Sequence, residues 1–239
     1  LAGYSVAAGG DVNGDGLADL IVGAWGSDPA AGSNAGRSYV VFGRTGSSAI
    51  DLAAITNGVG GFVINGQSAE DWSGVSVAGA GDVNGDGLAD LIVGAPLGDP
   101  GSSVVYADDY AGRSYVVFGK TSGDAVDLTA IASGAGGGFV LNGQSAYDFS
   151  GASVAGAGDF NGDGLGDLVV GAPLSSPPSG PYAGRSYVVF GNSTGSPINL
   201  SAVAVGSSGY VINGLCANEA GGSSVSSVGD INGDGLADL

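Results

Sequence analysis

The feature that most constrains this chain is a nine-residue stretch, Asp11-Val-Asn-Gly-Asp-Gly-Leu-Ala-Asp19, that occurs four times, with Phe160 and Gly166 substituted in the third copy and Ile231 in the fourth. The other copies span residues 82–90, 159–167 and 230–238. Each copy places side-chain oxygens at positions 1, 3, 5 and 9 and glycine at positions 4 and 6. Glycine enters left-handed backbone conformations at little steric cost, so the stretch can curl tightly. Because calcium takes roughly six to eight oxygen ligands, the stretch predicts four calcium loops.

Two other loop types share part of this pattern. A metal-free polar turn also uses Asn-Gly and Asp-Gly, but it gives no reason for aspartate at positions 1, 5 and 9 of every copy. An EF-hand shares the opening Asp-x-Asn-x-Asp-Gly but requires glutamate at position 12. That position is occupied by Val22, Val93 and Val170. The pattern therefore favours calcium loops over a polar turn and excludes an EF-hand.

The acidic composition limits the classes of partner. The 239 residues include 23 acidic and only five basic residues, and the formal charge is −18. Nucleic acids and anionic membrane surfaces are bound by clustered Lys and Arg, so neither is expected as a partner. No apolar run approaches the roughly 18 residues of a membrane span, so no membrane insertion is expected. Fifty glycines between many short apolar runs predict an all-β fold.

Three further expectations follow from the ends, the cysteine and the calcium loops. Leu1 falls inside a repeat, so the natural N-terminus is expected further upstream. The single cysteine, Cys216, excludes a disulfide framework within the chain. It takes the place of Ser68 and Ser145 in the other units, so we expect a small core residue. Calcium loops of weak affinity suit the millimolar calcium outside cells, which predicts an extracellular or cell-surface location.

The chain divides into repeat units, approximately residues 1–71, 72–148 and 149–219, with a partial unit at residues 220–239. Each complete unit contains four short apolar runs, and the nine-residue loop joins the first run to the second. In the first unit the runs are Tyr4-Ser-Val-Ala-Ala8, Leu20-Ile-Val-Gly-Ala24, Gly36-Arg-Ser-Tyr-Val-Val-Phe-Gly43 and Gly61-Phe-Val-Ile-Asn-Gly66. Short apolar runs separated by glycine-rich bends predict β-strands.

The strands predict a propeller. They are apolar at nearly every position, which indicates sheets that are covered on both faces. Four-stranded antiparallel blades stacked around an axis satisfy this, so the predicted fold is an all-β β-propeller with about three and a quarter blades. A linear solenoid is the alternative, but units of 71 residues exceed the common β-solenoid repeats. Asp51, Asp127 and Asn199 recur before the last strand and are predicted to cap a short helical turn.

The run from Gly74 to Pro96, Gly-x-Ser-Val-x-x-x-Gly-Asp-Val-Asn-Gly-Asp-Gly-x-x-Asp-Leu-Ile-Val-Gly-Ala-Pro, resembles the FG-GAP repeat of integrin α-subunit propellers and their bacterial relatives. The similarity covers three whole units and the opening of a fourth. Trp25 stands where the first proline of the family pattern would be. The phenylalanine of the Phe-Gly pair is replaced in each unit, by Ala2, Ser73, Ser150 and Gly221. These departures concern local packing.

The resemblance implies a calcium-binding propeller with more blades than this chain holds. It implies calcium ligands at loop positions 1, 3, 5, 7 and 9, with position 7 acting through its backbone carbonyl. In the first two loops these are Asp11, Asn13, Asp15, Leu17 and Asp19, and Asp82, Asn84, Asp86, Leu88 and Asp90. In the last two loops they are Asp159, Asn161, Asp163, Leu165 and Asp167, and Asp230, Asn232, Asp234, Leu236 and Asp238.

Catalytic constellations are scarce in this sequence. The chain has no histidine, which excludes a His-based triad. No phosphate-binding loop is present, because Gly-Asp-Gly carries acid where a phosphate needs donors. A carboxylate pair for glycoside hydrolysis would have to come from Glu70, Asp71, Asp108, Asp109 or Asp148. The sequence does not define their separation, and the chain is expected not to be an enzyme.

Two sets of residues are candidates for contacts between blades or with partners. Arg37, Arg113 and Arg185 recur in the third run, which favours a structural ion pair or blade-to-blade contact over a ligand clamp. Their candidate partners also recur in register, at Asp71, Asp148 and Glu219. In an antiparallel meander, the loops between the second and third runs lie opposite the calcium loops. The longest of them carries the candidate partner-binding residues Tyr106, Asp108, Asp109 and Tyr110. A solvated acidic loop is the alternative.

Together these features predict a non-enzymatic, calcium-stabilised extracellular propeller module for protein binding or adhesion. A calcium-dependent lectin and a non-catalytic module of a larger secreted enzyme are the alternatives. Three blades leave apolar faces and unpaired strand edges, which drive association. The chain is therefore expected either to self-associate or to be completed by further blades of a longer polypeptide.

Overall fold

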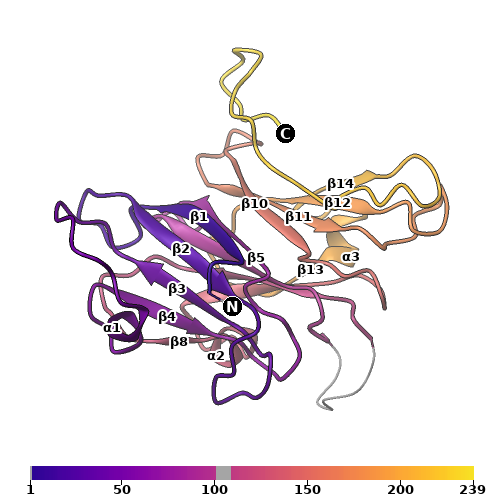
Figure 1. Cartoon of the computed structure of the whole chain (residues 1–239). Helices are drawn as coiled ribbons and strands as arrows, with labels where there is room; N and C mark the ends of the chain where they lie inside the picture. The colour runs from indigo at the N-terminus through magenta and orange to yellow at the C-terminus, as the bar shows by residue number, and fades with distance from the viewer. Residues whose placement is uncertain (1, 101–108) are drawn as a thin grey trace.

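The computed structural model describes residues 2–100 and 109–239 and contains three β-sheets that lie side by side (Figure 1). In the first sheet each strand is antiparallel to the next, in the order β1-β2-β3-β4. These strands are β1 (Ser5–Gly10), β2 (Asp19–Ala24), β3 (Arg37–Val41) and β4 (Gly61–Asn65). They coincide with the four apolar runs of the first repeat unit, so one unit builds one blade.

The second and third units repeat this blade with the same antiparallel strand order. The second blade consists of β5 (Ser76–Gly81), β6 (Asp90–Ala95), β7 (Arg113–Val117) and β9 (Gly138–Asn142). The third blade consists of β10 (Ser153–Gly158), β11 (Asp167–Ala172), β12 (Arg185–Val189) and β14 (Gly209–Asn213). The predicted all-β architecture of four-stranded antiparallel blades is confirmed.

A short strand from the following unit extends each of the first two blades. β8 (Val126–Asp127) pairs in parallel with β4, and β13 (Ile198–Asn199) pairs in parallel with β9. The helices are single turns at this place in the three units, namely α1 (Leu52–Thr56), α2 (Leu128–Ala132) and α3 (Leu200–Val203). Within the described ranges, none of the helices has the length and apolar character that a bilayer span requires.

The helix caps agree with the sequence prediction in two of the three units. The side chains of Asp51 and Asp127 each accept a 2.9 Å hydrogen bond from the backbone N–H two residues ahead. Asn199 makes no such bond. Its Oδ1 instead accepts a 3.1 Å bond from Nδ2 of Asn142 in the preceding blade. The capping prediction is therefore wrong for Asn199, whose side chain joins two blades.

The blades stack closely through their first two strands. β1, β5 and β10 lie next to one another, and Oγ of Ser76 in β5 accepts a 3.0 Å bond from the N–H of Val154 in β10. A Cβ atom built on Gly94 would lie 2.1 Å from the carbonyl oxygen of Gly151 in the next unit. Only glycine permits this approach, so the glycine of each Val-Gly-Ala run sets the spacing between blades.

The hydrophobic core lies between the blades in two clusters. One contains Phe62 and Tyr115, and the other contains Phe139 and Tyr187; all four side chains are fully buried. All residues of β6 and β11 are buried, as expected for strands that are covered on both faces. In β2 of the first blade, Leu20 is 46% exposed, because no described residue packs on that outer face.

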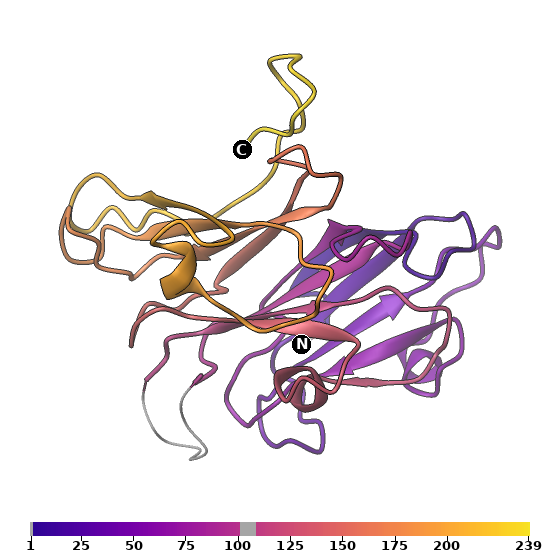
Figure 2. The ribbon, with the colours of Figure 1, turned by 180° about the vertical axis from the view of Figure 1, so that it is seen from behind.

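The partial fourth unit packs on the third blade without forming a sheet. The N–H of Val225 donates a 3.0 Å bond to Oγ of Ser153, which repeats the contact between complete blades. Among the described residues of this unit, the β-pairing consists of two isolated bridges, one between Gly221 and Gly184 of the third unit and one between Gly229 and Asp238. The first strand expected near Val225 is therefore not formed. The end of the unit projects beyond the third blade (yellow in Figures 1 and 2).

Cys216 is exposed, so the expectation of a core residue is wrong. Its N–H donates a 2.9 Å bond to Oε2 of Glu219, just as the N–H of Ser68 donates to Oδ2 of Asp71 at 3.1 Å. The position of Cys216 therefore belongs to a carboxylate-closed turn at the end of a unit. Its counterpart Ser145 is exposed as well.

Candidate functional site

The four aspartate loops, residues 11–19, 82–90, 159–167 and 230–238, share one backbone structure. In each loop the carboxylate at position 1 accepts hydrogen bonds from the backbone N–H groups at positions 4, 5 and 6. In the first loop these bonds are 2.8 to 3.0 Å long. The glycines at positions 4 and 6 of that loop have φ of 76° and 85°. The curl predicted from the glycines is present.

The side chains at positions 3 and 5 lie together on the rim of each loop. In the first loop, Oδ1 of Asn13 accepts the N–H of Asp15 at 2.8 Å, and Nδ2 of Asn13 donates to Oδ2 of Asp15 at 3.0 Å. Oδ1 of Asp15 accepts the N–H of Leu17 at 2.8 Å. The same bonds recur in the second and third loops. In the fourth loop, Nδ2 of Asn232 instead lies 3.5 Å from Oδ1 of Asp238.

In the first three loops the aspartate at position 9 is buried and ties its loop to the end of the third strand. Oδ2 of Asp19 accepts the N–H of Val12 at 2.8 Å, and Oδ1 accepts the N–H of Gly43 at 2.6 Å. The second and third loops repeat both bonds. The recurrence of aspartate at this position thus has a structural reason of its own, in addition to the predicted metal role.

The loops concentrate negative charge. Desolvation raises the pKa of Asp90 to about 6, in spite of its two backbone hydrogen bonds. The carboxylates of Asp86 and Asp82 raise it further by like-charge repulsion. Desolvation raises the pKa of Asp19 and Asp167 in the same direction. Each loop holds three carboxylates and no basic residue, so its local field attracts cations.

The four loops form one continuous row. The backbone N–H at position 8 of each later loop donates to the carbonyl oxygen at position 1 of the loop before it. These bonds run from Ala89 to Asp11 at 3.0 Å, from Gly166 to Asp82 at 2.7 Å and from Ala237 to Asp159 at 3.1 Å. The loops therefore lie side by side at the end of the blades where the first strand turns into the second, as the meander predicts.

The donor set of each loop has the chemistry of a hard-cation site. In the first loop, Asp11, Asn13, Asp15 and Asp19 supply side-chain oxygens and Leu17 supplies a carbonyl, the ligand types that calcium takes. Within residues 2–100 and 109–239, no three His, Cys, Asp or Glu side chains are gathered closely enough to hold a metal ion. In the first three loops the side chains at positions 3 and 5 bond to each other, and in every loop the carboxylate at position 9 accepts a backbone N–H. A cation would have to displace the bond between the side chains at positions 3 and 5.

A second polar cluster recurs where blades meet. Between the first two blades, Oε1 of Gln67 accepts a 2.6 Å bond from the Tyr115 hydroxyl and a 2.7 Å bond from Nη1 of Arg113. Between the second and third blades, Oε1 of Gln144 accepts a 2.8 Å bond from the Tyr187 hydroxyl. These glutamines are not among the residues predicted from the sequence. The signal for them is the Gly-Gln-Ser run after the last strand of the first two units.

The recurring arginines and carboxylates meet at the same junctions. Burial raises the pKa of Asp71 to about 7, and the positive charge of Arg113 in the next blade opposes that rise. Burial likewise raises the pKa of Asp148 to about 6, opposed by Arg185. This supports the blade-to-blade interpretation for Arg113 and Arg185, whose charges act on the carboxylates of the preceding unit. Asp71 and Asp148, candidates for a catalytic pair, lie at separate junctions.

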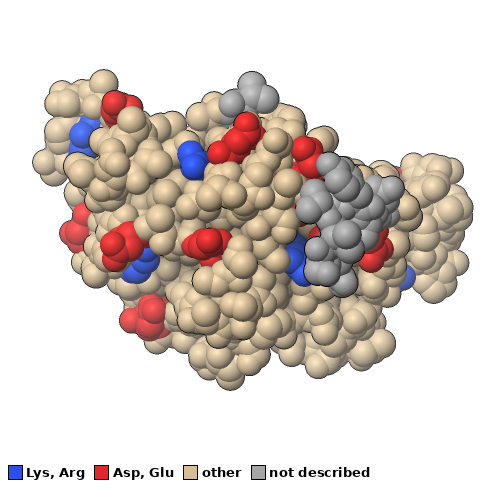
Figure 3. Space-filling model, turned by 90° about the horizontal axis from the view of Figure 1, so that it is seen from below, with Lys and Arg blue, Asp and Glu red and all other residues tan. Residues whose placement is uncertain are grey.

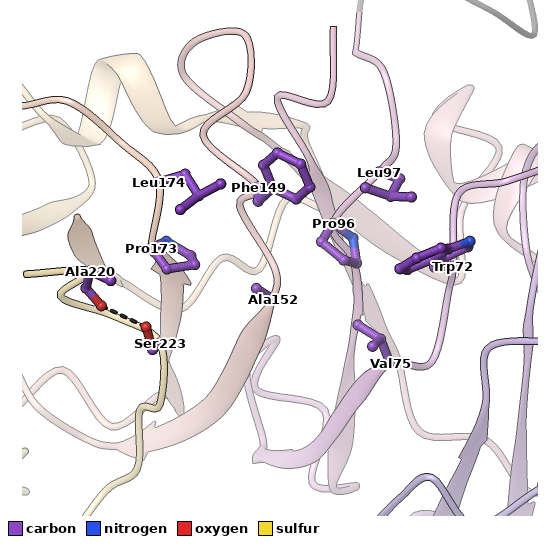
Figure 4. Close-up of a pocket in the computed structure, with 10 residues that line it drawn as sticks. All are labelled: Trp72, Val75, Pro96, Leu97, Phe149, Ala152, Pro173, Leu174, Ala220 and Ser223. Atoms are coloured by element: carbon purple, nitrogen blue, oxygen red, sulfur yellow. Dashed lines mark hydrogen bonds between the residues drawn. The ribbon is translucent and has the colours of Figure 1, made fainter. Parts of the chain in front are cut away.

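An apolar groove with a volume of about 380 Å³ lies at the opposite ends of the strands from the aspartate loops (Figure 4). Trp72 and Phe149 enter it from the turns that precede first strands, and Pro96 and Pro173 from the segments that follow second strands. In the fourth unit, Ala220 occupies the position that corresponds to Trp72 and Phe149. The groove therefore crosses two successive junctions and is walled by equivalent residues of successive units.

The predicted partner-binding residues Tyr106 and Asp108 lie outside the described residues. The backbone carbonyl of Asp109 accepts a 2.6 Å hydrogen bond from the N–H of Tyr147, near the end of the same unit. The Tyr110 ring centroid lies 5.8 Å from that of Phe149, at the groove. Asp109 and Tyr110 thus belong to the junction beside the groove. Figure 3 shows Lys and Arg side chains lying singly among Asp and Glu on a mostly uncharged surface.

Comparison with known proteins identifies the repeat. The family model for the FG-GAP repeat matches residues 2–41, 73–117 and 150–189. Integrin alpha-4 of Xenopus laevis is 31% identical over 180 residues, which are 74% of this chain and 15% of that protein. Integrin alpha-PS2 of Drosophila melanogaster is 30% identical over 199 residues, 78% of this chain and 12% of that protein. Phosphatidylinositol-glycan-specific phospholipase D of Bos taurus is 33% identical over 186 residues, 74% of this chain and 20% of that protein.

The chain therefore spans at most a fifth of the length of these relatives. Each matched segment contains an aspartate loop and the first three strands of a blade. The matches cover more than half of the chain and keep the order of its units. The chain belongs to the FG-GAP repeat family and is homologous to the integrin alpha subunits.

Proposed function

We propose that this chain is a calcium-stabilised, non-enzymatic propeller module that binds protein partners outside the cell. The observation that carries the proposal is the separation of two surfaces. The aspartate loops form a row at one end of the strands, and the apolar groove lies at the other end. A cation can thus stabilise the scaffold without occupying the surface that meets a partner. Integrin alpha subunits among the relatives support an adhesion-type module.

Calcium supplies positive charge to loops that hold three carboxylates each. The residues that would hold it are the oxygen donors at positions 1, 3, 5, 7 and 9 of each loop. Such a cation reduces the repulsion between Asp82, Asp86 and Asp90. Because it binds the folded loops better than the unfolded chain, it stabilises the fold by mass action. Millimolar calcium outside cells suits sites of weak affinity, which supports the extracellular assignment.

The calcium role is tested by melting the protein in excess chelator, in millimolar calcium and in equal magnesium. We expect a higher melting temperature in calcium than in chelator, with a smaller rise in magnesium, which demands a stricter geometry. Calorimetric titration of the chelated protein should show calcium binding. Identical melting curves in calcium and chelator, together with no heat of binding, would remove calcium from the proposal.

The partner role is tested at the groove. The full chain is immobilised and the adhesion of cells is measured in calcium. Trp72→Ala and Phe149→Ala remove aromatic walls of the groove, whereas Val59→Ala removes an exposed apolar side chain outside it. We expect adhesion to fall for both groove variants and to be unchanged for Val59→Ala. Equal adhesion by all three variants would place partner binding elsewhere.

A second candidate function is a non-catalytic module of a larger secreted enzyme. The specific observation in its favour is the similarity to phosphatidylinositol-glycan-specific phospholipase D. Release of a glycan-anchored reporter protein by the purified chain tests for activity, and we expect none.

A glycan array in the presence and absence of calcium tests the lectin alternative. Calcium-dependent glycan binding that Trp72→Ala abolishes would replace the protein-binding proposal.

A further inference from the structure

A second cavity, with a volume of about 290 Å³, lies at the junction between the second and third blades. The turn that follows β9 supplies one wall, and the segment between β11 and β12 supplies another. We name this cavity the junction pocket and define it by six of its lining residues. They are Tyr147 and Asp148 of the second unit, and Leu174, Pro181, Tyr182 and Arg185 of the third. Leu174 also lines the apolar groove, so the two cavities are neighbours (Figure 4).

Asp148 places a carboxylate in the wall of the junction pocket. The residue is only 4% exposed, and within the described residues its Oδ2 has no hydrogen-bond partner. Burial raises its pKa to about 6, whereas the charge of Arg185, the backbone of Ser145 and the nearby Ser175 hydroxyl oppose the rise. A cation in the pocket would stabilise the charged carboxylate, because opposite charges attract strongly where water is excluded.

Arg185 places a guanidinium in the same pocket. Its Nε donates a 3.1 Å bond to Oδ1 of Asn213. A guanidinium has five N–H donors, so the half-buried side chain keeps donors for a ligand. At the first junction, Nη1 of the equivalent Arg113 donates a 2.7 Å bond to a glutamine of the preceding unit. At the second junction the corresponding Gln144 accepts the Tyr187 hydroxyl, and within the described residues it takes no bond from Arg185.

Two exposed tyrosines complete the pocket. Tyr147 is 52% and Tyr182 is 51% exposed, although both line a cavity. Their rings, together with Leu174 and Pro181, give the pocket an apolar surface that can hold a side chain. The face of a tyrosine ring also attracts a cation. Apolar walls with a few charged groups between them are typical of sites for small molecules.

The two charges in the wall select the class of ligand. A carboxylate pairs with a guanidinium through two parallel hydrogen bonds, and an ammonium group pairs with a carboxylate. A ligand with both groups satisfies both walls and stays neutral overall. A ligand with a net negative charge is disfavoured by the formal charge of −18 on the chain. An uncharged sugar leaves both charges without an opposite charge.

We propose that the junction pocket binds a free α-amino acid with an apolar side chain. The carboxylate of the amino acid lies at Arg185 and its ammonium group at Asp148, while its side chain packs on Tyr147 and Tyr182. The volume of about 290 Å³ is near the lower end of small-molecule sites, which suits a ligand of this size. This inference does not rest on the proposed calcium and partner-binding roles.

The test is calorimetric titration of the full chain in calcium, with L-phenylalanine and L-leucine as probes. N-acetyl-L-phenylalanine has no ammonium group, as in the last residue of a peptide, and L-phenylalanine amide has no carboxylate, as in the first. We expect the free amino acids to bind and each modified form to bind about tenfold more weakly or worse. No binding of either free amino acid would overturn the proposal. So would equal binding of the free and modified forms.

Substitutions in the wall assign each charged group of the ligand. Asp148→Asn should weaken L-phenylalanine binding about tenfold and abolish its advantage over the N-acetyl form, because the ammonium group no longer has its partner. Arg185→Gln should abolish the advantage over the amide form. Asp71→Asn, which makes the same change at the first junction, is the matched control and should leave binding unchanged. Equal losses in Asp71→Asn and Asp148→Asn would overturn the assignment to this pocket.

Two further variants separate the junction pocket from the groove beside it. Tyr182→Ala removes an exposed ring, which does not endanger the fold, and should weaken binding several-fold. Trp72→Ala removes a wall of the apolar groove and should leave binding unchanged. The melting temperature of each variant without ligand shows that it is folded. A loss of binding in Trp72→Ala but not in Tyr182→Ala would place the amino acid in the groove and overturn the proposal.

Discussion

Ala89 donates its backbone N–H to the carbonyl oxygen of Asp11 over 3.0 Å, and this bond joins two aspartate loops whose first residues are 71 positions apart. The acceptor belongs to the residue whose carboxylate closes the first loop. Closure of one loop and its contact with the next are therefore linked through one residue. A perturbation of any loop should be felt by its neighbour, because the carboxylate that closes a loop and the carbonyl that contacts the next loop belong to the same residue.

The first prediction concerns the loop rim. Asp86→Asn removes one carboxylate and leaves an oxygen that can accept the N–H of Leu88. We expect calcium to raise the melting temperature less in this variant than in the wild type. In excess chelator the variant should melt at or slightly above the wild-type temperature, because repulsion between carboxylates is reduced. Asp124→Asn, at an exposed position outside the loops, is the control, because it also removes one negative charge. An equal calcium-induced rise in both variants would contradict a metal role for Asp86.

The second prediction separates structure from metal binding at position 9. Asp90 is fully buried and accepts the N–H groups of Gly119 and Val83, both at 2.8 Å. Asp90→Ala leaves both donors without partners, at about 1–3 kcal/mol each. We expect this loss of unfolding free energy in urea titrations even in excess chelator. Asp90→Asn keeps one acceptor oxygen and should lose less. A variant Asp90→Ala as stable as the wild type in chelator would show that these bonds contribute nothing.

The third prediction is a pH dependence from Asp71. Burial raises its pKa from 3.8 to about 7 in the folded protein. Between these values the folded chain binds more protons than the unfolded chain, so the contribution of Asp71 to stability is present at acidic pH and is lost as the pH rises through 7. Asp71→Asn keeps an acceptor for the N–H of Ser68 without the charge. Its melting temperature in chelator should match the wild type near pH 4 and exceed it at pH 8.

The control for this pH profile is again Asp124→Asn, which makes the same change of charge at an exposed position. A constant difference between Asp71→Asn and the wild type at both pH values would mean that the Asp71 carboxyl does not titrate between them. The measurement is a melting temperature at each pH in one buffer of fixed ionic strength, because surface charges are screened by salt.

The fourth prediction concerns the junction between the first two blades. Gln67→Leu removes the acceptor of the buried Tyr115 hydroxyl and of Arg113. We expect a loss of about 1–3 kcal/mol in unfolding free energy. Tyr115→Phe should lose less, and the double variant should lose less than the sum, because both single changes break one bond. Strict additivity in the double-mutant cycle would show that the two side chains are not coupled.

The fifth prediction uses the unequal caps. Asp127 accepts the N–H of Thr129 at 2.9 Å, whereas Asn199 makes no cap bond and joins Asn142 instead. Asp127→Ala should lower the unfolding free energy by about 1 kcal/mol, as expected for a helix cap. Asn199→Ala should instead weaken the contact between the second blade and the strand β13. Hydrogen exchange at the N–H groups of β13 distinguishes the two effects, since only the second should speed their exchange.

The sequence predicts the repeating elements well because their signals are local. Glycine at positions 4 and 6 of each loop, the apolar runs and the capping residue Asp51 each act within a few residues of the chain. The strands and the curl of the loops were therefore found at the predicted places. The fourth unit differs because a strand needs a neighbour: without a second strand beside it, the segment near Val225 has no pairing partner.

The junctions could not be predicted in the same way, because they join residues about 45 positions apart. In the sequence, Gln67 does not differ from a solvated turn residue. Its role appears only in the fold, where its side chain accepts the hydrogen bond of the Tyr115 hydroxyl. The arginines were recognised as structural, but their offset by one unit depends on how blades stack. Cys216 was assigned to the core by its small size, whereas its place is set by a turn at the end of a blade.

The short parallel strands have a consequence for how such a chain can be divided. β8 belongs by sequence to the second unit and by pairing to the first blade. The boundaries of the sequence repeats therefore do not coincide with the boundaries of the blades. Excision of one repeat would remove a strand from the blade before it and leave the donated strand of the next repeat without its partner. Tension applied along the chain would likewise have to break the pairing between such a strand and the neighbouring blade before a single repeat could extend. Neighbouring repeats are therefore expected to unfold together under tension, because each of the first two blades includes a strand of the next repeat.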